Sequence, residues 1–332
     1  MSSSLTPTLA IATVLAFASQ GCLNTSASGE NGAPSHRATP TMNTQTKRWI
    51  SSDRAEFPFR FWTPAKGQPK AVLIGVHGLN GSSSDFDIFG NSLIDDGIAV
   101  YAYEMRGQGN DPVKERIGDI EHPRAWLTDL ATFSSLVQSA HPDAKIFIYG
   151  ESLGSLITTF AVQNKQLITF EISGVILASP IVSFDDKLPF LKRLILQLAA
   201  VFAPGYRIDF VGLSPDDPRE MMVTSSASVA ESGEMTPWLV KKFSLRFFST
   251  VGRMIEQMMH RAERFEIPVL VLSGGKDVVM SAKQITEFTG RLPEKFRKHH
   301  AYPEGHHLLL YDDVNTEVVK DCRKWILDQL ER

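Results

Sequence analysis

Short apolar runs alternate along the chain with longer segments of helical spacing. The apolar runs are rich in β-branched residues, and most of them end in Gly, Ser or Pro. We expect strands at 71–76, 98–103, 145–149, 174–178, 268–272 and 299–302, and helices at 125–140, 153–162 and 314–330. Near-continuous apolar strands that alternate with helices are typical of a mostly parallel sheet covered by helices on both faces. The α/β pattern also includes a run at 56–62, which predicts an antiparallel lead-in strand.

One long interval, residues 181–266, breaks this alternation. It shows no clear strand, and it reads as helical and irregular, with a strongly apolar stretch at 188–202. An insertion between two strands of a parallel sheet is expected to lie over the carboxyl ends of the strands, where ligands bind. We therefore expect an α/β core made of residues 49–180 and 264–332, with a helical cap at 181–263.

The N-terminal segment has the features of an export signal. Residues 1–21 contain an apolar stretch without charged side chains that is too short to span a bilayer. Cys22 follows this stretch as in a bacterial lipobox, and residues 22–48 have the composition of a flexible tether. Ser19 stands where a lipobox has Leu, and cleavage after Ala18 with plain secretion is the alternative. The expected location is a bacterial membrane, through lipid on Cys22, or otherwise the periplasm or the medium.

Composition and charge exclude some partners. The chain has 332 residues, 43% of them hydrophobic, and a net charge of -3, so no global field favours nucleic acid. The second of its two cysteines, Cys322, is expected to be a small apolar residue of the last helix. The oligomeric state is left open.

A candidate nucleophile lies between an expected strand and an expected helix. Gly150-Glu151-Ser152-Leu153-Gly154 has the pattern G-x-S-x-G in its strand–turn–helix context. The glycines Gly150 and Gly154 allow a tight turn that presents the Ser152 hydroxyl above the sheet. The simpler interpretation is a serine in a glycine-rich turn.

A serine hydroxyl needs a base, and the base needs an orienting carboxylate. Asp277 follows the strand at 268–272, and His306 and His307 follow the next strand, so all three groups come from loops at strand ends. The spacing alone does not choose between the two histidines. The acidic pair at 312–313 is the alternative source of the carboxylate.

Stabilisation of a tetrahedral intermediate needs backbone donors aimed at its oxygen. The expected donors are the N–H of Leu153, which follows the nucleophile, and the N–H of Leu79, in the loop after the strand at 71–76. His77 in this loop is expected to be structural.

With these residues in place, the chain resembles α/β-hydrolases of the monoacylglycerol lipase and lysophospholipase type. The resemblance begins near residue 57 and rests on VHGLNG, YEMRGQGND, YGESLG, VILASP, PVLVLSGGKDVV and YPEGHH, in this order. It implies an α/β-hydrolase fold, a Ser152–His307–Asp277 triad, no cofactor and no metal. In the family the base stands five positions after the tyrosine of the last strand, which selects His307 and leaves His306 as a pocket neighbour.

The chain departs from the family pattern in the loop that supports the oxyanion region. Glu104 replaces an Asp, Gln108 replaces a common His, and Asn110 replaces a Ser. These changes put the geometry of that loop in question but leave the triad intact. A metal site made of the histidine pairs at 299–300 and 306–307 is disfavoured, because adjacent strand residues point to opposite faces.

The apolar stretch at 188–202 is the main indication of the substrate. It includes Phe190 and Leu194, which we name as pocket candidates for an acyl chain, although the same face could pack inside the cap. The expected activity is hydrolysis of a lipid ester, a monoacylglycerol or a lysophospholipid, through an acyl-enzyme. The alternatives are a small-ester carboxylesterase, a thioesterase or an aminopeptidase-like amidase, and, less favoured, a binding protein without catalysis.

Overall fold

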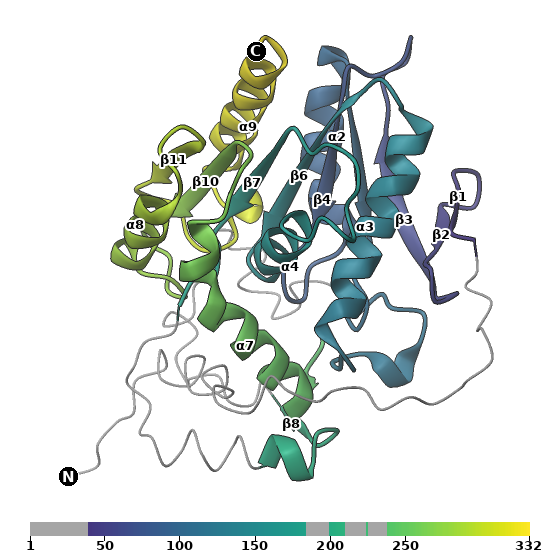
Figure 1. Cartoon of the computed structure of the whole chain (residues 1–332), viewed down its shortest axis with the longest axis vertical. Helices are drawn as coiled ribbons and strands as arrows, with labels where there is room; N and C mark the ends of the chain where they lie inside the picture. Colours follow the sequence, from purple (N-terminus) through teal and green to yellow (C-terminus); the bar gives the residue numbers. More distant parts are fainter. Residues whose placement is uncertain (1–38, 184–198, 210–223, 225–237) are drawn as a thin grey trace.

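The computed structural model describes residues 39–183, 199–209, 224 and 238–332. Its centre is a nine-stranded sheet in the order β1-β2-β3-β5-β4-β6-β7-β10-β11. Helices pack on both faces of this sheet, and α7 runs from the core towards β8 (Figure 1).

The central strands are parallel, as the apolar runs predict. The sheet comprises β1 (Thr41–Asn43), β2 (Arg48–Ile50), β3 (Glu56–Trp62), β4 (Ala71–Val76), β5 (Ile98–Tyr103), β6 (Lys145–Glu151), β7 (Gly174–Ala178), β10 (Val269–Gly274) and β11 (Arg297–Tyr302). The strands from β5 to β11 in the sheet order pair in parallel, whereas β3 pairs with β5 antiparallel. The sheet therefore carries its loops at the carboxyl ends of neighbouring strands, where a site is expected.

Two apolar cores cover the two faces of the sheet. One core contains side chains of α3 (Pro123–Ala140), α4 (Leu153–Val162), α7 (Leu245–Ala262) and α8 (Ala282–Arg291). The other contains side chains of α2 (Asp87–Leu93) and α9 (Asn315–Leu330), and Cys322 is buried there as expected. The structure also contains short 3-10 turns: η1 (Ser83–Phe86), η2 (Ile94–Asp96), η3 (Lys114–Arg116) and η6 (Leu309–Tyr311). The predicted α/β fold, with its mostly parallel sheet between helices, is confirmed.

The structure differs from the sequence predictions at two places. The insertion after β7 is not free of strands, because β8 (Arg207–Asp209) and β9 (Lys242–Ser244) pair antiparallel. These strands have three residues each, so their alternation is too short to stand out in a sequence. At the end of the segment predicted to be a tether, β1 pairs with β2, which crosses the predicted boundary between tether and core. The folded chain therefore begins before residue 49.

Several predictions fall outside the described residues. These are the export signal, Cys22, and the pocket candidates Phe190 and Leu194. The division into core and cap is untested and stays a prediction. Over the ranges that the structure describes, no helix is both long and apolar enough to cross a membrane.

Candidate active site

The nucleophile turn (residues 150–154) holds Ser152 in a backbone conformation that a non-glycine residue rarely adopts. Its φ is 51° and its ψ is -113°, which is the strained geometry expected of a nucleophile between a strand and a helix. A Cβ at Gly154 would lie 2.1 Å from the carbonyl oxygen of Val76, and a Cβ at Gly150 would lie 2.5 Å from the oxygen of Gly154. Only glycine fits at these two positions, because the obstacles are backbone atoms.

Three predicted residues form one hydrogen-bonded chain. His307 Nε2 lies 2.8 Å from Ser152 Oγ, and His307 Nδ1 lies 2.8 Å from Asp277 Oδ2. The distances are those of strong hydrogen bonds. The carboxylate oxygen of Asp277 accepts a hydrogen bond, so His307 Nδ1 is the donor and carries the proton. His307 Nε2 is then free of a proton and can accept the one from Ser152.

The loop after β10 fixes the carboxylate of Asp277. Its Oδ1 accepts the backbone N–H groups of Val279 and Met280 at 2.7 and 3.0 Å. Its Oδ2 therefore remains for the histidine. The side chains of Asp277 and His307 are 1% and 6% exposed, so water competes little for their hydrogen bond.

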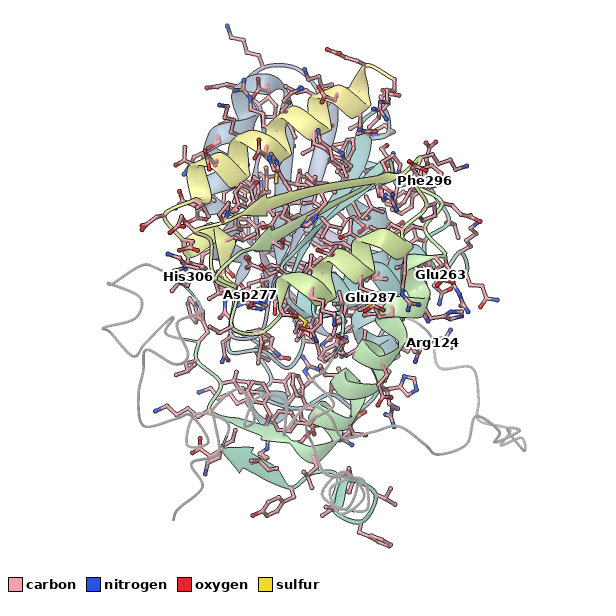
Figure 2. All side chains as sticks on the ribbon, turned by 90° about the vertical axis from the view of Figure 1, so that its left-hand side faces the viewer. Arg124, Glu263, Asp277, Glu287, Phe296 and His306 are labelled. Carbon is pink, nitrogen blue, oxygen red and sulfur yellow. The ribbon has the colours of Figure 1, made fainter. Side chains whose placement is uncertain are left out.

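His306 is engaged elsewhere. Its backbone N–H and its ring Nδ1 both face the carboxylate of Asp312, with Nδ1 at 3.1 Å from Oδ2. Figure 2 shows Asp277 and His306 close together, past the carboxyl ends of β10 and β11. Asp312 thus fixes the histidine loop (residues 305–312) by binding His306 at two points. The sequence predicted Asp312 only as an alternative to Asp277 for the triad carboxylate.

The oxyanion loop (residues 77–82) lies against the nucleophile turn. A Cβ at Gly78 would lie 3.3 Å from Ser152 Cβ, so the loop backbone passes directly beside the serine. Neither Leu79 N–H nor Leu153 N–H donates to another group in the described ranges. Their role as oxyanion donors stays a prediction.

His77 braces this loop as expected. Its Nδ1 lies 2.8 Å from the carbonyl oxygen of Gly78, and its Nε2 lies 3.0 Å from the backbone nitrogen of Met105. The amide of Met105 can only donate and the carbonyl of Gly78 can only accept. His77 is therefore a neutral imidazole with its proton on Nδ1.

The departures from the family pattern make defined contacts. Gln108 Oε1 accepts the N–H of Asn80 at 3.1 Å, and Asn80 Oδ1 accepts the N–H of Val240 from the insertion at 2.8 Å. Glu104 Oε1 accepts both the N–H and the hydroxyl of Ser83. Gln108 thus holds the oxyanion loop, Glu104 holds the start of η1, and Asn80 connects the oxyanion loop to Val240.

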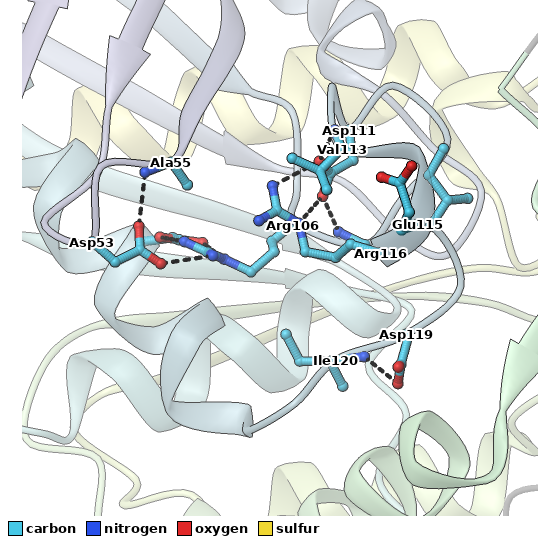
Figure 3. Close-up of polar contacts among 12 residues, drawn as sticks. Asp53, Ala55, Arg106, Asp111, Val113, Glu115, Arg116, Asp119 and Ile120 are labelled. Carbon is cyan, nitrogen blue, oxygen red and sulfur yellow. Dashed lines mark hydrogen bonds and ion pairs between the residues drawn. The ribbon is translucent and has the colours of Figure 1, made fainter. Parts of the chain in front are cut away.

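Arg106 anchors the neighbouring loop through buried ion pairs. Its Nε and NH2 groups bind Asp129 at 2.7 and 2.8 Å, and its NH1 binds Asp53 at 2.7 Å (Figure 3). Asp111 accepts from the side chain of Arg116 in the same loop. The ion pairs raise the pKa of Arg106, whereas burial raises the pKa of Asp129 despite them.

The described residues contain no group of three or more His, Cys, Asp or Glu side chains placed to hold a metal ion. The histidines on β11 contact other groups: His299 Nε2 lies 2.9 Å from Ser273 Oγ, and His300 Nδ1 lies 3.0 Å from Asp321. The described site thus brings together a nucleophile and a base with its carboxylate.

Comparisons with known proteins identify the family of the chain. A family model described as serine aminopeptidase, S33, matches residues 67–314. A phospholipase of Bacillus subtilis, YtpA, is 24% identical over 271 residues, which cover 79% of this chain and 97% of that protein. A monoglyceride lipase of the rat is 23% identical over 283 residues, which cover 83% of this chain and 88% of that protein. One curated relative is much longer: the match to an abhydrolase domain-containing protein of Dictyostelium discoideum spans 30% of it.

A solved structure shares the fold. A soluble variant of monoglyceride lipase from Saccharomyces cerevisiae superposes with a TM-score of 0.71 at 20% identity, over 90% of this chain and 99% of the other. The chain thus belongs to the serine aminopeptidase S33 family, as an α/β-hydrolase of the monoacylglycerol lipase and lysophospholipase type.

Proposed function

We propose that the protein is a serine hydrolase that cleaves the carboxylic ester of a lipid, a monoacylglycerol or a lysophospholipid, through an acyl-enzyme on Ser152. The observation that carries the proposal is the hydrogen-bonded chain from Asp277 through His307 to Ser152. The family and the lipid-ester hydrolases among its relatives support the class of reaction.

Each group has one task in the first half of the reaction. His307 Nε2 takes the proton of Ser152 while the serine oxygen attacks the ester carbonyl carbon. The N–H groups of Leu79 and Leu153 donate to the oxygen that becomes negative in the tetrahedral intermediate. Asp277 stabilises the imidazolium that forms and keeps its ring in place.

The intermediate collapses when His307 gives the proton to the leaving alcohol. The alcohol is glycerol for a monoacylglycerol and a glycerophosphodiester for a lysophospholipid. Water then attacks the acyl-serine, with His307 again as the base. The fatty acid is released and Ser152 regains its proton. The described site therefore completes the cycle without a cofactor.

The substrate assignment rests on the relatives and on the apolar insertion. In the apolar stretch that contains Phe190 and Leu194, Val201 and Phe202 are 72% and 82% exposed. An exposed apolar surface of this kind suits an acyl chain better than a charged peptide. The export signal with lipid on Cys22 would hold such an enzyme at a membrane. A Cys22→Ala chain that still takes up labelled fatty acid in bacteria would exclude this anchor.

The test is fatty-acid release by the purified protein from a medium-chain monoacylglycerol and from a lysophospholipid. A short nitrophenyl ester and an amino-acid amide complete the panel. Ser152→Ala should abolish release, His307→Ala should lower it by several orders of magnitude, and His306→Ala, the matched control, should retain most of it. Cleavage of the short ester or the amide alone would reject the lipid assignment. Equal activity of wild type and Ser152→Ala would reject the mechanism.

A further inference from the structure

Two carboxyl groups of the loops around the candidate nucleophile are buried. Glu151 precedes Ser152 at the end of β6, and Asp85 belongs to η1; they are 1% and 6% exposed. The charge of Asp85 raises the pKa of Glu151. The triad uses neither group.

The two carboxyls join the three loops that build the site. The backbone N–H of Leu310, in the histidine loop, donates to the carboxyl of Glu151 on the nucleophile turn. The hydroxyl of Tyr311, also in the histidine loop, donates to Asp85 Oδ1 at 2.5 Å. Asp85 Oδ2 in turn accepts the N–H of Ser82 in the oxyanion loop at 3.1 Å.

The packing around the pair leaves little room for movement. A Cβ at Gly81 would lie 2.4 Å from Asp85 Oδ2, so the oxyanion loop passes directly over this carboxyl. Glu151 Oε1 has no hydrogen-bond partner among the described residues. A carboxylate left without a partner in such a site is costly. A protonated, neutral Glu151 is therefore the form that this packing accommodates.

Other titratable groups also face the pair. Tyr149 on β6 and Tyr311 on η6 are neutral, since burial raises the pKa of each phenol far above its usual range. Around Asp85, a charge on His77 lowers the pKa of this carboxyl and the charge of Glu104 raises it. Neither histidine nor tyrosine is among the groups that lower the pKa of Glu151, so a second negative charge at Glu151 would be unfavourable.

Burial, with the charge of Asp85, raises the pKa of Glu151 to about 8. Burial also raises the pKa of Asp85, whereas its hydrogen bonds from Tyr311 and Ser82 oppose this rise. At neutral pH Glu151 thus holds its proton.

We propose that Glu151 is a positioning residue that acts as a neutral acid. While it holds its proton, the nucleophile turn, the oxyanion loop and the histidine loop stay together. Loss of this proton sets the alkaline limit of hydrolysis. The proposal rests on the proposed function of Ser152. Its chemistry is one proton leaving Glu151 for solvent. The second charge that remains pushes η1 away from β6 and opposes the negative charge that develops on the substrate oxygen.

The test is the pH profile of kcat/KM between pH 6 and 10 on a soluble short-chain ester. The wild type should lose activity on the order of tenfold, with a midpoint near the pKa of about 8. Glu151→Gln should lose this alkaline limb and keep the acid limb. Glu104→Gln, a buried control whose carboxyl accepts from Ser83 rather than from the histidine loop, should keep the wild-type midpoint.

A second variant covers the case in which Glu151→Gln does not fold. Asp85→Asn removes the neighbouring charge, so the midpoint should move to lower pH and the limb should become shallower. An alkaline limb that keeps its midpoint in Glu151→Gln, or in Asp85→Asn where the first variant is unfolded, would overturn the proposal.

A readout without turnover separates this proposal from the proposed function. In Ser152→Ala protein, amide hydrogen exchange of residues 305–312, corrected for the chemical rate, should accelerate above pH 8 and stay protected when Glu151→Gln is added. Equal exchange in both proteins would refute the positioning role even if esters are cleaved. A wild type that cleaves no ester refutes the proposed function, and the exchange experiment still decides whether the proton of Glu151 holds the loops.

Discussion

The buried Glu151 should make the stability of the protein depend on pH in a way that Glu151→Gln removes. The pKa of this carboxyl rises from its ordinary value of 4.5 to about 8 in the folded protein. Between these two values the folded chain binds one more proton than the unfolded chain. The free energy of unfolding therefore falls as pH increases, by about 1.4 kcal/mol per pH unit.

The sign and size follow from this difference. The contribution of Glu151 is fully present below pH 4.5 and is lost as pH rises to about 8, where the loss levels off. Summed over that window, the loss is about 5 kcal/mol. Glutamine has nearly the same volume and no charge, so the variant lacks this loss and should become the more stable protein at alkaline pH.

The assay is urea unfolding followed by tryptophan fluorescence at half-unit steps from pH 4.5 to 9. The difference between Glu151→Gln and wild type should change linearly in favour of the variant and become constant above pH 8. Glu287→Gln, an exposed exchange on α8, should follow the wild type throughout. Parallel curves for wild type and Glu151→Gln would mean that Glu151 is already ionised at neutral pH, which would refute the burial argument.

Three further predictions concern the supports of the site. Asp277→Asn should lower kcat on the order of 10⁴-fold, because its amide N–H₂ would face Nδ1 and force the catalytic imidazole into the wrong tautomer; a kcat within tenfold of wild type would contradict this role. Asp129→Ala should destabilise the fold by about 3–5 kcal/mol, since it leaves Arg106 buried with only a half-exposed partner, as measured by urea unfolding. Gly154→Ala should prevent correct folding, because its Cβ would lie 2.1 Å from a backbone oxygen at the end of β4, whereas Gly290→Ala on α8 meets nothing within 4 Å and should raise stability by about 0.5–1 kcal/mol.

The sequence by itself determined the parallel sheet and the elements that carry the triad. Apolar runs long enough to be buried on both faces predicted β4, β5 and β7 with their observed bounds. The nucleophile turn could be located because its two glycines and its flanking strand and helix are local requirements. Chain order then limited the acid and the base to the loops after β10 and β11.

The tertiary structure decided what spacing could not. The neighbouring histidines differ only in the carboxylate that each one reaches: His307 reaches Asp277, and His306 reaches Asp312. The short strands β8 and β9 and the early pairing of β1 and β2 depend on partners rather than on periodicity. The proton on Glu151 is also a tertiary property, because burial and the charge of Asp85, which lies far away in sequence, set the energy of its ionised form.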